Sequence, residues 1–257
     1  MARRGKRQSY NMAESSGEFA PWLGVFETLR VVNGVPLFLA PHQAELKRAM
    51  DALGLTSDFD FVKAGAALPP LSGRWRWLVT PEGTRTFFSE ETFPPDVPIT
   101  LSTSSVRIGS GNWDARFKTI SYLTHIQAWK TGSTSEVVLL NEHGNIASGA
   151  RANIFWRLGD LLFTPSHESG CRQGIVRSFV LMQRSVRQGH FPPRALQEAD
   201  EIFLTNSIKG IVSVNQWEGR SLRLFSIADK LREEYEAEIA AQIGGRRPKA
   251  CSPERQP

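Results

Sequence analysis

Residues 25–40 read VFETLRVVNGVPLFLA and predict a β-hairpin. Residues 25–32 are rich in β-branched side chains, Asn33-Gly34 is a favoured two-residue turn, and residues 35–40 are expected to return as the partner strand. Pro41 then opens a predicted helix whose apolar side chains share one side, and Gly54 ends it. A hairpin that leads into an amphipathic helix indicates an α+β fold.

The remaining patterns divide the chain into two halves. The first half also contains a predicted helix at 57–68, a hairpin at 75–80 and 84–88, and a strand at 99–106. Beyond the turn-prone run Gly109-Ser110-Gly111-Asn112, helices are predicted at 119–130, 175–187, 193–199 and 227–243, and strands at 136–141, 153–157, 161–163 and 201–206. We expect a disordered basic N-terminal tail (1–18), a small α+β domain (19–107), an interdomain linker (108–116), a large α+β domain (117–243) and a disordered basic C-terminal tail (244–257).

Composition excludes several classes of protein. The chain has 257 residues, of which 40% are hydrophobic and 22% charged, so collagen-like, coiled-coil and wholly disordered chains are ruled out. No apolar run approaches the roughly 20 residues of a membrane span, and no signal peptide precedes residue 19, so a cytoplasmic location without membrane attachment is expected. The net charge of +5 resides in the two tails, which carry +7 together, so nucleic-acid binding is not expected.

Three local features carry chemistry, whereas metal-ligand spacing, glycine-rich phosphate loops and nucleophile elbows are missing from the sequence. Lys118 leaves the linker and enters a predicted helix among apolar neighbours, where a desolvated amine can attack an aldehyde. Gly174-Ile175-Val176 begins a helix whose free amides could cradle a phosphate. Thr205-Asn206-Ser207 could add donors to the same group. Taken singly, Lys118 is better explained as a surface lysine and Gly174-Ile175-Val176 as an ordinary helix start, and a polar turn also explains Thr205-Asn206-Ser207.

Taken together and in order, these features make the chain resemble the class IV aminotransferases, the fold-type IV enzymes that use pyridoxal 5′-phosphate (PLP). The resemblance covers about three quarters of the chain. It rests on eight segments: Gly24 to Arg30, Asn33 to Pro36, His42, Lys118 to Tyr122, Asn153 to Phe155, Thr164-Pro165, Gly174 to Arg177 and Ala199 to Ser207. It implies two α+β domains of the D-amino acid aminotransferase type, PLP held between them, amino acid and 2-oxo acid substrates, and a homodimer.

The resemblance also implies roles for particular residues. Lys118 aligns with the lysine that forms the Schiff base with PLP and then moves the proton. The amides of the Gly174-Ile175-Val176 segment align with the phosphate site, to which Thr205 and Ser207 add hydroxyl donors. Tyr122 lies close to where many members place a tyrosine near the phenolic oxygen of the cofactor.

Two departures from the family pattern bear on activity. Ser148 occupies the position of the glutamate that pairs with the ring nitrogen of PLP, and a hydroxyl stabilises a carbanion less than a carboxylate-protonated ring does. Glu45 occupies the position of the arginine that holds the phosphate. A lyase of the 4-amino-4-deoxychorismate type and a non-catalytic relative that keeps the fold are therefore retained as alternatives to an aminotransferase.

Overall fold

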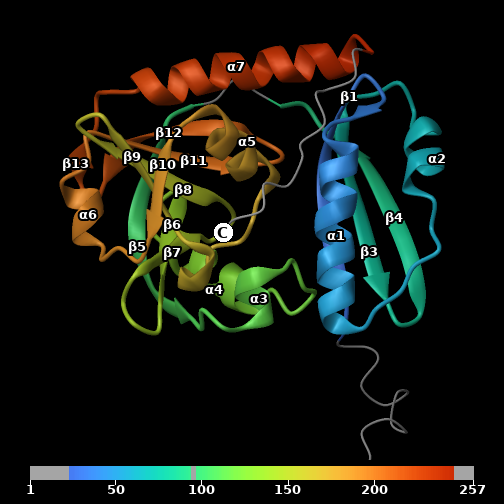
Figure 1. Ribbon diagram of the computed structural model, residues 1–257, viewed down its shortest axis with the longest axis horizontal. Coiled ribbons are helices and arrows are strands. Elements are labelled where there is room, and N and C mark those ends of the chain that lie inside the picture. Colours follow the sequence, from blue (N-terminus) through green and yellow to red (C-terminus); the bar gives the residue numbers. More distant parts are fainter. Residues whose placement is uncertain (1–22, 94–96, 246–257) are drawn as a thin grey trace, which may run out of the picture.

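The structure is a computed structural model that describes residues 23–93 and 97–245, so the predicted N-terminal tail and nearly all of the C-terminal tail lie outside the described residues. Two sheets stand side by side (Figure 1). The first is antiparallel, in the order β2-β1-β3-β4, and carries helices α1 and α2. Its elements are β1 (Val25–Val32), β2 (Val35–Pro36), α1 (Leu39–Leu53), α2 (Phe61–Ala66), β3 (Gly73–Thr80) and β4 (Gly83–Glu90).

The predicted hairpin is present, but its second strand is shorter than expected. Asn33 and Gly34 adopt φ angles of 49° and 80°, the left-handed backbone that this tight turn requires. Phe38 is also left-handed, with φ 53°, and this reverses the chain so that α1 begins at Leu39 in place of a continued strand. The buried face of the sheet packs on α1 through a tryptophan-rich core that includes Trp75 and Trp77.

The second sheet has nine strands, in the order β10-β9-β8-β11-β12-β5-β6-β7, with β13 paired to β12. Its strands are β5 (Ile99–Ile108), β6 (Glu136–Asn141), β7 (Ile146–Gly149), β8 (Asn153–Leu158), β9 (Leu161–Pro165), β10 (Val186–Gly189), β11 (Glu201–Asn206), β12 (Gly210–Trp217) and β13 (Arg220–Ser221). The helices of this half are α3 (Trp113–Arg116), α4 (Leu123–Thr131), α5 (Ile175–Gln183), α6 (Arg194–Gln197) and α7 (Ser226–Ile243).

Four expectations differ from the structure. The strand at 99–108 belongs to the second sheet, because it pairs in parallel with β6 and β12, so the change of sheet falls before it and the turn-prone run only connects β5 to α3. Lys118 lies in extended chain ahead of α4, not in a helix. The helix expected at 175–187 ends at Gln183, and the next residues form β10. Strand β12, which the sequence reading passed over, is buried at the centre of the sheet.

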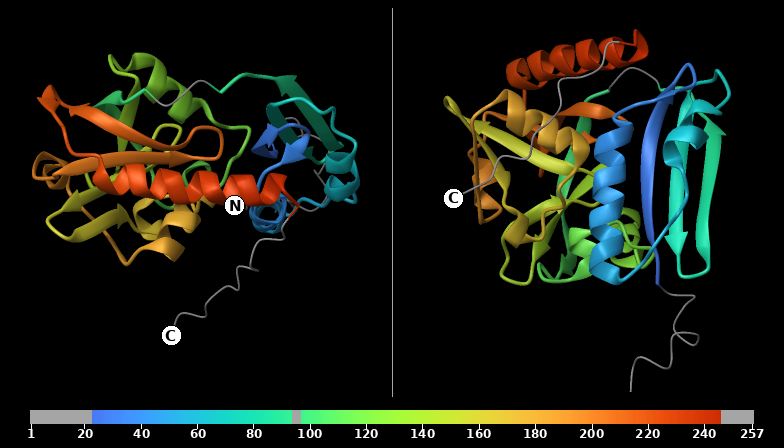
Figure 2. Two further views of the ribbon diagram at one scale, coloured as in Figure 1. Left: turned by 90° about the horizontal axis from the view of Figure 1, so that it is seen from above. Right: turned by 45° about the vertical axis from the view of Figure 1, so that its right-hand side comes forward.

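Helix α7 joins the two halves. It runs across the top of both sheets in Figure 1, and Figure 2 shows the same arrangement from above. Phe38 stacks on Tyr235 of this helix with ring centroids 5.4 Å apart, and the Phe38 amide donates to Gln242 Oε1. These contacts fix the first sheet against the second and leave a cavity between them. Within the described residues, no helix is long and apolar enough to span a membrane.

Candidate functional site

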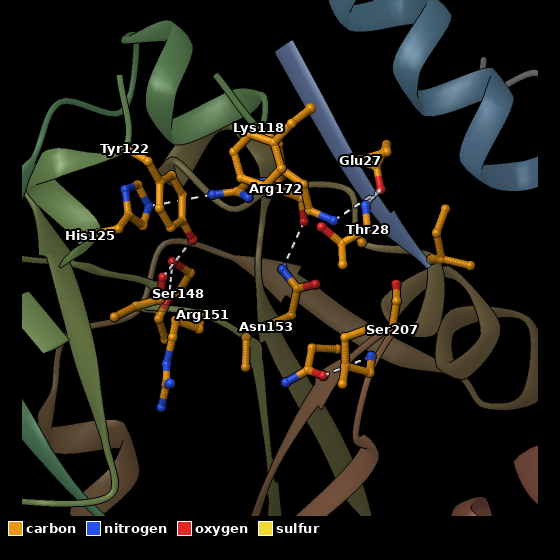
Figure 3. Close-up of a pocket in the computed structure, with 18 of the residues that line it drawn as sticks. Glu27, Thr28, Lys118, Tyr122, His125, Ser148, Arg151, Asn153, Arg172 and Ser207 are labelled. Atoms are coloured by element: carbon orange, nitrogen blue, oxygen red, sulfur yellow. Dashed lines mark hydrogen bonds and ion pairs between the residues drawn. The ribbon is translucent and has the colours of Figure 1, made fainter. Parts of the chain in front are cut away.

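A cavity of about 960 Å³ opens between the two sheets. Its walls come from β1, α1, the chain at 116–122, the start of α5 and the turn between β11 and β12 (Figure 3). All eight predicted site residues line it, namely Lys118, Tyr122, Ser148, Gly174, Ile175, Val176, Thr205 and Ser207. Segments nearly 90 residues apart in the sequence therefore converge on one space.

Lys118 is held by a buried carboxylate. Its ammonium donates to Glu27 Oε2 at 3.0 Å, and His42 Nδ1 lies 2.7 Å from the same oxygen. Burial alone would raise the pKa of Glu27, but the charge of Lys118 and the hydrogen bond from His42 outweigh it and lower that pKa to about 2. Glu27 is therefore ionised at neutral pH, and it fixes the position of the lysine on the cavity wall.

A stack of side chains lies on the other side of Lys118. Tyr122 and His125 are parallel, with centroids 4.4 Å apart, and the Arg172 guanidinium lies 5.3 Å from the centre of the Tyr122 ring. The Tyr122 hydroxyl donates to the Ala150 carbonyl at 2.9 Å. Burial, and then the charge of Arg172, lower the pKa of His125 to about 3, so its imidazole is neutral at neutral pH.

The start of α5 is an open set of donors. Gly174 precedes the helix, and among the described residues no side chain caps the first turn. A Cβ at Gly174 would collide with Asn153 Oδ1, so a larger residue there would force Asn153 to move. Asn153 in turn donates to the Arg172 carbonyl at 2.8 Å, and this hydrogen bond fixes the segment that leads into α5. The amides of Ile175 and Val176 therefore face the cavity wall with the positive end of the helix dipole behind them.

The turn after β11 completes this end of the cavity. Asn206 Oδ1 accepts from the amides of Ile208 and Lys209, at 3.0 and 2.8 Å, and this shapes the turn that carries Ser207. Thr205 is 1% exposed, and within the described residues its hydroxyl has no hydrogen-bond partner. A buried, unpartnered hydroxyl beside an uncapped helix start fits a phosphate group, since both then gain an acceptor. The residues present therefore fit the phosphate and aldehyde ends of PLP.

The two departures from the family pattern also line the cavity. Ser148 is buried in β7 and donates to the Gly149 carbonyl at 2.8 Å. Glu45 projects from α1 and pairs with Arg48 at 2.6 Å, and burial raises its pKa.

Sequence reasoning missed several residues of the site. Glu27 and His42 were quoted only as parts of segments, and Asn153, His125 and Arg172 were given no role. The signal for Glu27 was available, because it shares an otherwise apolar strand face with Val25, Leu29 and Val31, and an acid on such a face needs a buried partner. The pairing of His125 with Arg172 joins residues 47 positions apart, and no local pattern predicts it.

Comparison with known proteins gives a consistent result. Residues 24–217 match the family described as amino-transferase class IV. The aminodeoxychorismate lyase of Bacillus subtilis is 27% identical over 222 residues, which cover 74% of this chain and 76% of that protein. A probable branched-chain-amino-acid aminotransferase of Thermotoga maritima is 28% identical over 216 residues, covering 75% of this chain and 76% of that one. The structure of a Brucella abortus aminotransferase bound to PLP superimposes with a TM-score of 0.73 at 20% identity, covering 91% and 95% of the two chains, so the fold is shared.

Proposed function

Because the chain belongs to the class IV aminotransferase family, we propose that it binds PLP at Lys118 and transfers the amino group of an amino acid to a 2-oxo acid. The observation that carries the proposal is the position of Lys118. Its ammonium lies on the wall of the cavity against an ionised, buried carboxylate, and the same cavity holds the uncapped start of α5. A nucleophile for an aldehyde and a site for a phosphate thus share one space.

Different residues of the chain have different roles in the proposed reaction. PLP, when bound, withdraws electrons from the carbon that carries the substrate amine. Lys118 would take the proton from that carbon as general base and deliver it, as general acid, to the cofactor carbon that came from the aldehyde, as transfer of the amino group requires. Glu27 and His42 keep the Lys118 amine directed along the wall. The amides of Ile175 and Val176 with the hydroxyls of Thr205 and Ser207 hold the phosphate, and the two sheets exclude water from the space between them.

A lyase of the aminodeoxychorismate type is the second candidate. The similar protein from Bacillus subtilis is named an aminodeoxychorismate lyase. The cavity also favours an anionic substrate, because Arg74 and Arg76 of β3 and Arg116 of α3 line it. A substrate with two carboxylates would be attracted to such a surface.

We propose a homodimer as well. The face of α4 beside the cavity exposes Leu123, Ile126 and Trp129, which are 76%, 40% and 36% accessible and lie three residues apart. Trp113 of α3 is 54% exposed in the same half. An exposed helical stripe of this kind is typical of an interface, and a second copy of the chain would bury it. A cytoplasmic location agrees with Cys171, which is a buried thiol that forms no disulfide within residues 23–93 and 97–245.

The test is an absorbance titration of the purified protein with PLP, followed by borohydride reduction and peptide mass spectrometry. We expect a visible band that reduction removes, and a PLP-sized mass increase on the peptide containing Lys118. Lys118→Ala should abolish both, whereas Lys230→Ala, on the exposed side of α7, should change neither. Absence of the band at saturating PLP would favour the non-catalytic relative. If the band forms, amino-donor and aminodeoxychorismate assays then separate the two reactions.

A further inference from the structure

The corner of the cavity formed by Tyr122, His125, Ser148 and Arg172, here called the donor corner, lies apart from Glu27 and Ser207 (Figure 3). Arg172 reaches across it, with Nη2 3.5 Å from His125 Nε2. Its carbonyl is fixed by Asn153 Nδ2 and by the Gly174 amide at 2.8 and 3.0 Å. Hydrogen bonds therefore fix the backbone of Arg172, and the contact with His125 positions its guanidinium.

Two buried N–H groups of this corner have no acceptor. His125 is neutral at neutral pH, and its Nε2 faces Arg172, so the ring proton belongs on Nδ1. Within residues 23–93 and 97–245, neither His125 Nδ1 nor Arg172 Nε has a hydrogen-bond partner. Buried donors without acceptors are costly, and they indicate a group that arrives with the ligand.

No carboxylate of the cavity is available to the donor corner. The three acids among the described residues that line the cavity are each engaged elsewhere: Glu27 with Lys118 and His42, Glu45 with Arg48, and Glu136 with Arg151 at 3.2 Å. The corner therefore offers a cation, a neutral imidazole and a hydroxyl, and nothing that would neutralise a second cation placed beside them.

The substituent pattern of PLP would direct its ring nitrogen toward this corner. In PLP the nitrogen is para to the carbon that carries the aldehyde, and the phosphate arm is attached next to that carbon. If the aldehyde reaches Lys118 and the phosphate lies at α5 and Ser207, the nitrogen edge would point away from both. We propose that the donor corner holds the ring nitrogen unprotonated, as an acceptor for the Arg172 guanidinium, whose Nε has no partner within the described residues. This rests on the proposed function.

The consequence for the reaction is a weaker electron sink. A neutral ring withdraws electrons less than a protonated one, so charge that develops at the substrate carbon is less stabilised. Lys118 would then have to pass the proton promptly from the substrate carbon to the former aldehyde carbon of the cofactor, which agrees with a lysine held rigidly by Glu27 at 3.0 Å. Arg172 acts here on the cofactor and positions it.

The experiment is ¹⁵N NMR of the protein loaded with PLP that is labelled at the ring nitrogen. We expect the chemical shift of an unprotonated pyridine in the wild type and a shift to the protonated value in Ser148→Glu combined with Arg172→Leu. Arg187→Gln, an exposed arginine of β10, is the matched control and should leave the signal unchanged. A protonated signal in the wild type would overturn the proposal.

A second readout needs neither turnover nor the double variant. PLP methylated at the ring nitrogen carries a fixed positive charge there, so the wild type should bind it at least about tenfold more weakly than PLP. The ratio of the two affinities should be smaller in the milder variant Arg172→Gln, which removes the positive charge. It should be unchanged in Arg172→Lys, which keeps that charge. Equal affinity for the two compounds in the wild type would contradict the proposal. If no reducible link forms at Lys118, the proposed function fails first; if the link forms and the nitrogen is protonated, only this inference fails.

Discussion

The backbone amide of Phe26 donates a hydrogen bond to the carbonyl of Lys118 at 2.8 Å. The Ile120 amide donates to the Gly24 carbonyl at 3.0 Å, and Val25 and Thr119 form an isolated bridge. The chain around Lys118 is therefore attached to the edge of β1, although it follows the first strand of the second sheet. This attachment places the lysine beside Glu27, because Glu27 is the next residue of β1 after Phe26.

Replacing Glu27 by glutamine should impair catalysis more than cofactor binding. The amide keeps the shape of the side chain but leaves the Lys118 ammonium without its counter-charge. Turnover should fall by about 10- to 100-fold, a typical range for a group that supports proton transfer. Affinity for PLP, measured by fluorescence titration, should remain within about threefold. Glu236→Gln, an exposed acid of α7, is the control. An unchanged turnover would remove Glu27 from the mechanism.

Replacing Glu45 by glutamine should strengthen PLP binding. Glu45 adds a buried negative charge to the wall of a cavity that is proposed to hold a phosphate. Removing the charge, and freeing Arg48 from it, should raise the affinity about 3- to 10-fold at low salt and by less at high salt, because salt screens the phosphate. Asp51→Asn, exposed on the same helix, should have no effect. Equal affinities would mean that Glu45 lies too far from the phosphate.

The Gly174→Ala variant tests the packing that shapes the start of α5. Its Cβ would collide with Asn153 Oδ1, and moving Asn153 would break its hydrogen bond to the Arg172 carbonyl. We expect a loss of about 1–3 kcal/mol in the free energy of unfolding. PLP affinity should drop by at least about tenfold. Gly111→Ala, with open space around it, is the control. Adding Asn153→Ala should recover part of the stability, so additive losses would contradict this packing.

Acid should destabilise the protein through His125. Its pKa is about 3 in the folded state, against 6.5 for the ordinary group, so only the unfolded chain gains this proton as the pH falls from 6.5 to about 3. The free energy of unfolding must therefore decrease across that range. His125→Asn should show a shallower decrease in urea titrations at successive pH values than the wild type or His143→Asn, whose histidine is exposed. Parallel curves would show that burial does not lower the pKa of His125.

The Leu123→Glu variant tests the proposed dimer. A charge at the start of the apolar stripe of α4 should oppose burial of that stripe, since an unpaired charge at an interface is costly. Sedimentation velocity should show a dimer for the wild type and for Gln197→Glu, an exposed position of α6, and a monomer for Leu123→Glu. A monomeric wild type would refute the dimer, and a dimeric Leu123→Glu would place the interface elsewhere.

Local patterns in the sequence were sufficient for the first hairpin, helix α1, the hairpin of β8 and β9, and the start of α5, because turns, caps and apolar periodicity act over a few residues. The predicted site residues, which came from local patterns together with the family resemblance, all line one cavity, and their roles there stay predictions. The sheet to which β5 belongs required the tertiary structure, since strand partners are chosen by contacts between distant segments.

The same holds for the chemistry of the site. The ionised state of Glu27 depends on Lys118 and His42, and the neutral state of His125 depends on burial and on Arg172. Both states arise from desolvation and from charges that only folding brings within a few ångströms. The amino-acid sequence specifies which residue types are present, whereas the folded environment determines the protonation of the buried groups.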